Sequence, residues 1–171
     1  MSEQASPPTP PTRQKPGVGF VLSHPAHFIA FGFGSGLAPI APGTFGSLVA
    51  IPIVWWLLPL VGNVAWACVI AVSFAIGVWA CGVTGRALGI ADYGGIVWDE
   101  VVGMMLVLWI VPLTPVWIAA AFLLFRVFDI VKLPPANYFD RHWKNGLGVM
   151  MDDIAAAGHA LIVLAIALRF F

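Results

Sequence analysis

Five long apolar runs constrain the fold of this chain more than any other feature of its sequence. They cover residues 45–61, 64–83, 97–112, 116–131 and 154–170. Each has roughly 16 to 20 residues, close to the length that a helix rising about 1.5 Å per residue needs to cross the apolar core of a bilayer. The sequence therefore predicts an all-α fold, a polytopic membrane helical bundle with about five membrane-embedded helices.

The composition agrees with a lipid environment. The chain is 60% hydrophobic and 9% charged, whereas soluble domains average about 25% charged residues. Its formal net charge is zero, so it lacks the basic excess that would indicate nucleic acid as a partner. The two cysteines, Cys68 and Cys81, lie in one apolar run and are interpreted as small hydrophobic residues rather than a disulfide or a metal site.

The first 16 residues differ in character from the rest of the chain. They are rich in Pro, Ser and Thr and contain no apolar run, so they do not match a signal peptide. We expect a disordered tail over residues 1–16 and one membrane-embedded domain over residues 17–171.

The connection between the third and fourth runs is very short. Only Leu113 and Thr114 separate the two prolines, Pro112 and Pro115, that end and begin these runs. One kinked helix is conceivable there, but two proline breaks three residues apart favour a hairpin. The sequence then predicts five crossings. The third and fourth runs are the shortest, and partly buried helices that do not span the membrane fully remain an alternative for these two runs.

The basic residues indicate which way the bundle faces. With five crossings, seven of the eight Lys and Arg residues fall on the side where the chain starts, and only Arg169 falls on the other side. Such an excess marks the cytoplasmic side of a membrane protein. Nearly all the acidic residues lie at the same ends of the runs, so we expect the functional site to face the cytoplasm.

Paired carboxylates define the predicted site. Six acids against three basic residues leave this region with a formal charge of minus three; the acids are Asp99, Glu100, Asp129, Asp140, Asp152 and Asp153, and the basic residues are Arg126, Lys132 and Arg141. Such a charge near a membrane is costly without a counter-ion and repels phosphate. Mg²⁺ prefers carboxylate and phosphate oxygens, so the count predicts metal-assisted phosphoryl chemistry.

A glycine-rich segment precedes the first long run. Residues 32–47 contain five glycines together with Ser35, Thr44 and Ser47. Backbone N–H groups in such a turn can bind an anion, although a tight re-entrant turn with packed glycines explains the composition equally well. Both interpretations stay open.

Several phosphatase chemistries do not fit the sequence. The aspartyl-phosphate motif DxDx[TV] is absent, and four residues rather than five separate Cys81 from Arg86. The four histidines are scattered; His159 lies in the last apolar run, where a packed or hydrogen-bonded helix residue is the expected role, and His27 is expected at the interface.

Four motifs in order resemble the phosphatidylglycerophosphatase A family. They are GFGSGLAPIAPGTFGSLVAIP, IVWDEVVGM, FRVFDIVK, and FDR followed by GLGVMMDDIAAAG. The resemblance implies an all-helical, Mg²⁺-dependent enzyme of the bacterial inner membrane. The implied reaction removes the terminal phosphate of phosphatidylglycerophosphate to give phosphatidylglycerol. The resemblance also implies that the active site faces the cytoplasm. The sequence departs from the family's KPWP motif, because Leu133, Pro134 and Pro135 follow Lys132.

The resemblance also implies roles for individual residues. Asp99, Glu100, Asp129 and Asp153 are expected to bind Mg²⁺, and Asp99 and Asp152 to take part in catalysis. The substrate is a lipid held in the bilayer, and the residues expected to bind it are Ser35, Gly43, Thr44, Ser47, Arg126, Lys132 and Arg141. Asp152 as general base and an aspartate as covalent nucleophile both remain open, as do the number of metal ions and the oligomeric state.

Two other functions fit the sequence less well. A CDP-alcohol phosphatidyltransferase also combines membrane helices with acidic metal ligands, but its DGxxAR…GxxxDxxxD signature is absent. A membrane cation carrier would place its acidic residues near the middle of the bilayer, whereas these lie at one boundary.

Overall fold

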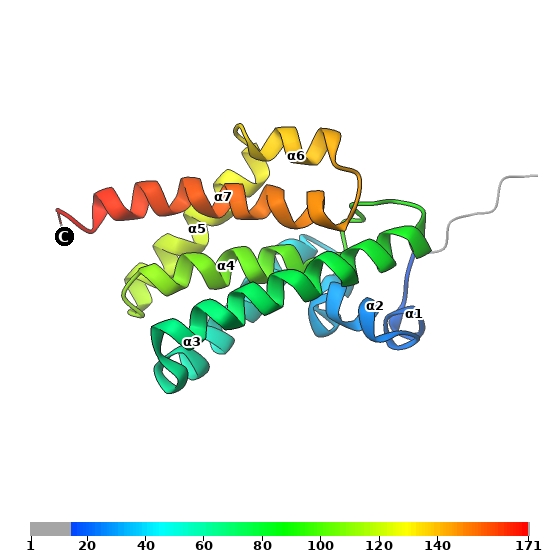
Figure 1. Ribbon diagram of the computed structural model, residues 1–171, viewed down its shortest axis with the longest axis horizontal. Helices are drawn as coiled ribbons and strands as arrows, with labels where there is room; N and C mark the ends of the chain where they lie inside the picture. Colours follow the sequence, from blue (N-terminus) through cyan, green and yellow to red (C-terminus); the bar gives the residue numbers. More distant parts are fainter. Residues whose placement is uncertain (1–14, 171) are drawn as a thin grey trace, which may run out of the picture.

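The computed structural model describes residues 15–170, and all regular secondary structure in that range is helical (Figure 1). The elements in order are α1 Val18–Leu22, α2 Pro25–Ala30, the 3₁₀ helix η1 Gly32–Leu37, α3 Pro42–Leu88, α4 Trp98–Ile110, α5 Pro115–Val131, α6 Ala136–His142 and α7 Gly146–Ala167. The prediction of an all-α fold is confirmed for this range. The predicted tail lies outside the described residues except for its last two positions.

The first two apolar runs form the two limbs of α3. Gly62 has φ 73° and ψ 172°, a conformation that is open to glycine and interrupts the helix. The limbs, residues 42–61 and 63–88, fold back on each other in Figure 1. The predicted connection at residues 62 and 63 is therefore a helical hairpin.

The third and fourth runs form separate helices. α4 ends at Ile110, and α5 begins at Pro115, whose fixed φ and missing N–H suit the first turn of a helix. Val111 and Thr114 between them are extended, each with ψ of 154°. The prediction of a hairpin rather than one kinked helix is confirmed.

The prediction of five membrane-spanning helices is not confirmed. Within the described residues, two helices, α3 and α7, are long and apolar enough to cross a membrane. α4 has only 13 residues, which gives about 20 Å of helix against a bilayer core of about 30 Å. Residues such as Val101, Met104 and Leu108 are fully buried, so much of the apolar run reflects packing against protein rather than against lipid.

The outer surface of the bundle is apolar on several helices. Trp56 and Val64 on α3, Val116 and Ile130 on α5, and Ile162 on α7 are all more than half exposed. Soluble proteins rarely leave so many large apolar side chains exposed, and such surfaces indicate contact with lipid or another apolar partner.

Most of the helix connections lie towards two ends of the molecule (Figure 1). The turn within α3, the α4–α5 turn and the C-terminal end of α7 lie at one end. The loop after α3, the helices α1 and α2, and the α6–α7 connection lie towards the other. The N-terminal ends of α4 and α7 therefore meet near the C-terminal end of α3, and this end carries the candidate site.

Candidate active site

Three carboxylates from two helices form a compact group, which we call the acidic centre. Asp99 and Glu100 lie in the first turn of α4, and Asp153 lies on α7. One carboxylate oxygen from each of the three lies within 4.8 Å of the others. Asp99 and Asp153 are only 7% and 3% exposed. The start of α4 is fixed by Val97, whose N–H donates to the carbonyl of Ala30 over 2.8 Å.

The acidic centre contains polar atoms without partners. Asp99 Oδ1, Glu100 Oε2 and Asp153 Oδ2 are buried and have no hydrogen-bond donor among residues 15–170. Buried carboxylates that repel one another and lack donors are unfavourable unless a cation accompanies them. Oxygen ligands of this kind suit a hard divalent cation. The residues present therefore fit the predicted Mg²⁺.

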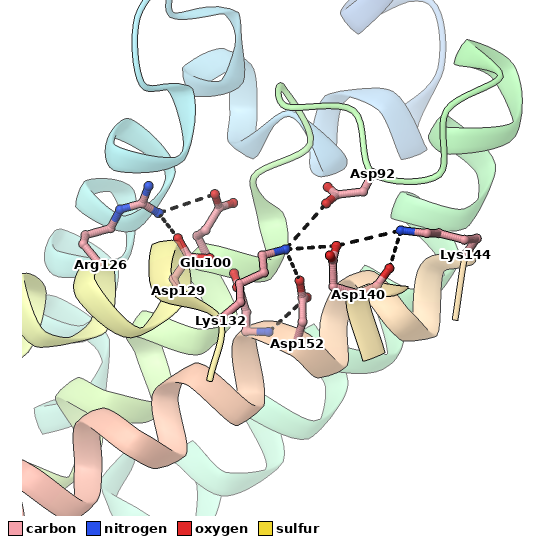
Figure 2. Close-up of polar contacts among 9 residues, drawn as sticks. Asp92, Glu100, Arg126, Asp129, Lys132, Asp140, Lys144 and Asp152 are labelled. Carbon is pink, nitrogen blue, oxygen red and sulfur yellow. Dashed lines mark hydrogen bonds and ion pairs between the residues drawn. The ribbon is translucent and has the colours of Figure 1, made fainter. Parts of the chain in front are cut away.

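Arg126 on α5 connects the acidic centre to a fourth carboxylate. Its Nη1 lies 2.7 Å from Asp129 Oδ2, one turn along the same helix, and 3.5 Å from Glu100 Oε1 on α4 (Figure 2). All three side chains are largely buried. The structure thus brings the predicted residues Arg126 and Asp129 to the edge of the acidic centre.

The glycine-rich segment packs directly against this pair. A Cβ atom at Gly43 would overlap Glu100 Oε1 and would lie 3.0 Å from Arg126 Nη1. Gly36 is packed as closely against the backbone of Gly95, and Gly46 against Val97. The segment is therefore a tight turn of packed glycines. Binding of an anion by its backbone N–H groups stays a prediction.

The three hydroxyl residues and Arg141, all predicted to bind substrate, differ in their burial and in their contacts. Ser47 Oγ donates to the carbonyl of Gly43 over 3.0 Å within α3. Ser35 Oγ is buried and has no partner in the described part of the chain, while Thr44 is half-buried. Arg141 is exposed on α6 and forms no ion pair with any residue between 15 and 170.

A second polar group, which we call the lysine cluster, is centred on Lys132. Lys132 Nζ lies 2.8 Å from Asp152 Oδ2, 3.1 Å from Asp140 Oδ1 and 3.9 Å from Asp92 Oδ2 (Figure 2). Lys132 ends α5 with a left-handed backbone, φ 49°. The cluster joins the ends of α5 and α6 and the N-terminal half of α7 to the loop after α3.

The charge of Lys132 is well stabilised. Burial alone would lower the pKa of Lys132, but the hydrogen bond and charge of Asp152, with help from Asp140 and Asp92, raise this pKa overall. The ammonium group therefore remains protonated at any physiological pH. It is a permanent cation beside the acidic centre.

The structure differs from the sequence prediction at two residues, Asp152 and Asp92. Asp152 and Asp153 were expected in one acidic centre, but Asp152 points to Lys132 and accepts a hydrogen bond from the Asp153 N–H over 3.0 Å. Asp92 was not predicted to belong to the site, yet it joins the lysine cluster. No spacing signal in the sequence brings the loop at Asp92 to Lys132.

The two histidines considered from the sequence form hydrogen bonds outside the acidic centre and the lysine cluster. His27 is buried, and its Nδ1 lies 3.0 Å from Thr84 Oγ1 on α3. His159 Nδ1 lies 2.8 Å from the carbonyl of Ala155 on its own helix, and its ring stacks on Phe128. His159 is thus a packed, hydrogen-bonded helix residue, as predicted.

The fold and the site together define a helical protein with apolar outer faces and a charged centre at one end. The family model described as phosphatidylglycerophosphatase A matches residues 28–168. The chain belongs to the phosphatidylglycerophosphatase A family, and it is a phosphatase.

Curated relatives agree with this assignment. The chain is similar to phosphatidylglycerophosphatase A of Escherichia coli K12, with 44% identity over 79% of this chain and 78% of the relative. It is also similar to phosphatidylglycerophosphatase A of Haemophilus influenzae, with 45% identity over 89% and 94%. A third relative, from Bacteroides thetaiotaomicron, carries the provisional name phosphatidylinositol-3-phosphatase and is 42% identical over 81% and 91%. No solved structure matches the chain.

Proposed function

We propose that the chain hydrolyses the terminal phosphomonoester of phosphatidylglycerophosphate and releases phosphatidylglycerol and phosphate for phospholipid biosynthesis. The names of the two relatives that are 44% and 45% identical support this substrate. The observation that carries the proposal is the buried acidic centre from α4 and α7, with Arg126 at its edge. This arrangement suits a reaction in which negative charge on a phosphoryl group must be neutralised.

The carboxylates of the acidic centre are the proposed Mg²⁺ ligands. Asp99, Glu100 and Asp153 would hold the ion, and Asp129, which pairs with Arg126 at the edge of the acidic centre, would be a further ligand. Their oxygen atoms without donors support this assignment. When bound, Mg²⁺ would polarise the phosphate and lower the pKa of a water molecule.

Arg126 and Lys132 are the proposed partners of the phosphate oxygens. Arg126 Nε is buried and has no acceptor within residues 15–170, so its N–H can donate to a phosphate oxygen. Lys132 is held by three carboxylates from different parts of the chain. Both cations are fixed before substrate arrives, which limits the reorganisation needed during the reaction.

The contacts of Asp152 favour a positioning role over that of general base. Its Oδ2 accepts a hydrogen bond from Lys132, and its Oδ1 accepts one from the Asp153 N–H. These two contacts fix the orientation of the carboxylate, and the Lys132 ammonium stabilises its ionised form. We therefore propose that Asp152 orients Lys132 and the start of α7.

We further propose that the enzyme is a multi-pass protein of the bacterial inner membrane with its site towards the cytoplasm. The apolar lengths of α3 and α7 support membrane insertion. The excess of Lys and Arg at the end of the bundle that holds the site supports the orientation. The acyl chains of the substrate can then stay in the bilayer while its headgroup enters the site.

The orientation predicts which cysteine a membrane-impermeant thiol reagent reaches in spheroplasts. In a Cys68→Ser background, Arg169→Cys beyond the end of α7 should be labelled from outside, whereas His142→Cys on α6 should be labelled only after lysis. Both positions are exposed. External labelling of His142→Cys alone would mean an inverted orientation, and labelling of both from one side would mean an even number of crossings.

The substrate itself can be tested with two lipid phosphates. Purified protein in detergent with Mg²⁺ should release phosphate faster from phosphatidylglycerophosphate than from phosphatidylinositol 3-phosphate, presented at equal mole fraction. The second lipid is the relevant competitor because of the name of the third relative. Release from the inositol lipid alone would contradict the proposed substrate and leave the phosphatase class intact.

A further inference from the structure

A cavity of about 320 Å³ lies beside the candidate site, between the C-terminal end of α3 and the α6–α7 connection. Its two charged lining residues, Arg86 and Lys144, are both cations, and Asn145 and Gly146 complete that side. We call it the basic cavity. The proposed reaction has so far given a role to neither cation.

Arg86 is available for a ligand. It lies in the last turn of α3, its side chain is exposed, and it forms no ion pair with any residue in the described range 15–170. Lys144 is only loosely paired, since its Nζ lies 4.0 Å from Asp140 Oδ1 and its other contact is to the Asp140 backbone carbonyl. The charge and the size of the basic cavity therefore suit an anion.

The basic cavity is adjacent to the lysine cluster. A small cavity lined by Asp92, Asp140 and Asp152 shares two lining residues, Ala91 and Lys144, with the basic cavity. Figure 2 shows Lys144 beyond Asp140 on the side away from Arg126. The acidic centre, the lysine cluster and the basic cavity thus follow one another along this end of the molecule.

A groove continues from the basic cavity along α3 and α7. A cavity of about 230 Å³ shares Gly82, Arg86, Asn145 and Gly146 with it and is also lined by Val78, Trp79 and Leu147. Trp79 and Leu147 are 47% and 38% exposed. The groove is therefore basic at one end and apolar at the other. These two ends match the anionic phosphate and the apolar acyl chain of a glycerophospholipid.

We propose that Arg86 and Lys144 bind the phosphodiester of the lipid substrate, while the apolar groove along Trp79 and Leu147 holds the start of an acyl chain. This inference rests on the proposed function. A phosphatidyl headgroup with a terminal phosphate carries a monoester and a diester joined by a short polyol. The monoester occupies the acidic centre and Lys132, and the diester, a monoanion, occupies the basic cavity. The site thereby selects a lipid over a soluble phosphomonoester.

The binding test uses short-chain phosphatidylglycerol, which has the diester and lacks the monoester. Calorimetric titration should show binding to the wild-type protein, and Arg86→Gln should weaken it at least about 10-fold, the usual effect of losing one charge-assisted hydrogen bond. Arg86→Lys should recover part of the affinity. Arg169→Gln, at the other end of α7, is the matched control and should bind as the wild type does.

The kinetic test separates this inference from the proposed function. Arg86→Gln combined with Lys144→Gln should raise KM for phosphatidylglycerophosphate at least about 10-fold with kcat nearly unchanged. An active enzyme in which these changes alter neither KM nor phosphatidylglycerol affinity would overturn the inference alone. Failure of the wild type to bind phosphatidylglycerol, or equal weakening in Arg169→Gln, would overturn it as well. An inactive wild type that binds phosphatidylglycerol through Arg86 would instead refute the proposed reaction and support the subsite.

Discussion

Asp153→Asn is expected to lower the turnover of phosphatidylglycerophosphate at least about 100-fold, as the loss of a metal ligand does. Asp153 is 3% exposed, and its Oδ2 has no hydrogen-bond donor in the described part of the chain. The amide has almost the same shape but removes one negative charge from a group of three carboxylates. Asp99→Asn should have the same effect for the same reason.

Loss of folding would be a different explanation, and thermal unfolding distinguishes it. Because the substitution removes repulsion between buried carboxylates, metal-free Asp153→Asn should unfold at a temperature no lower than that of the metal-free wild type. Asp92→Asn is the matched control. Asp92 is 39% exposed and lies 3.9 Å from Lys132, which keeps two closer carboxylates, so its loss should cost no more than several-fold. Equal losses at Asp92 and Asp153 would contradict the assignment of the acidic centre.

The sequence predicted the helical fold well because two local signals were strong. Long apolar runs placed the helices, and the prolines at 112 and 115 placed the turn between α4 and α5. The number of membrane crossings was not predictable in the same way. A run such as that of α4 has the same composition whether its side chains contact lipid or, like Met104 and Leu108, are buried in protein.

The short helices were not predicted either. α1, α2 and α6 have 5, 6 and 7 residues, too few to leave a clear apolar period in the sequence. They depend on tertiary contacts, such as the hydrogen bond from Val97 to Ala30 that joins α2 to the start of α4.

The candidate site could be predicted in part. Acidic residues at the start of α4 and on α7 indicated a common centre, and the structure brings Asp99, Glu100 and Asp153 together. Counting Asp152 with them ignored the rotation of about 100° between neighbouring residues of a helix, which turns Asp152 towards Lys132. Lys144 and Arg86 were not predicted to bind substrate because their importance depends on a cavity between distant segments.

Removal of divalent metal is expected to abolish activity. When ionised, Asp99, Glu100, Asp129 and Asp153 carry four negative charges, and Arg126 is the single cation paired with any of them in the described residues. The resulting formal charge of minus three repels a phosphate dianion, so substrate binding itself requires a cation. The enzyme should recover full activity when Mg²⁺ is returned, because chelation leaves the protein chain unchanged.

The most direct test is phosphate release from phosphatidylglycerophosphate by protein that has been treated with EDTA and dialysed into metal-free detergent buffer. We predict no release above background before Mg²⁺ is added, followed by a saturable increase as Mg²⁺ is titrated. The Asp153→Asn protein should show no such increase at the same Mg²⁺ concentrations. Full turnover by the rigorously metal-free wild type would contradict the assignment of the acidic centre as a metal site.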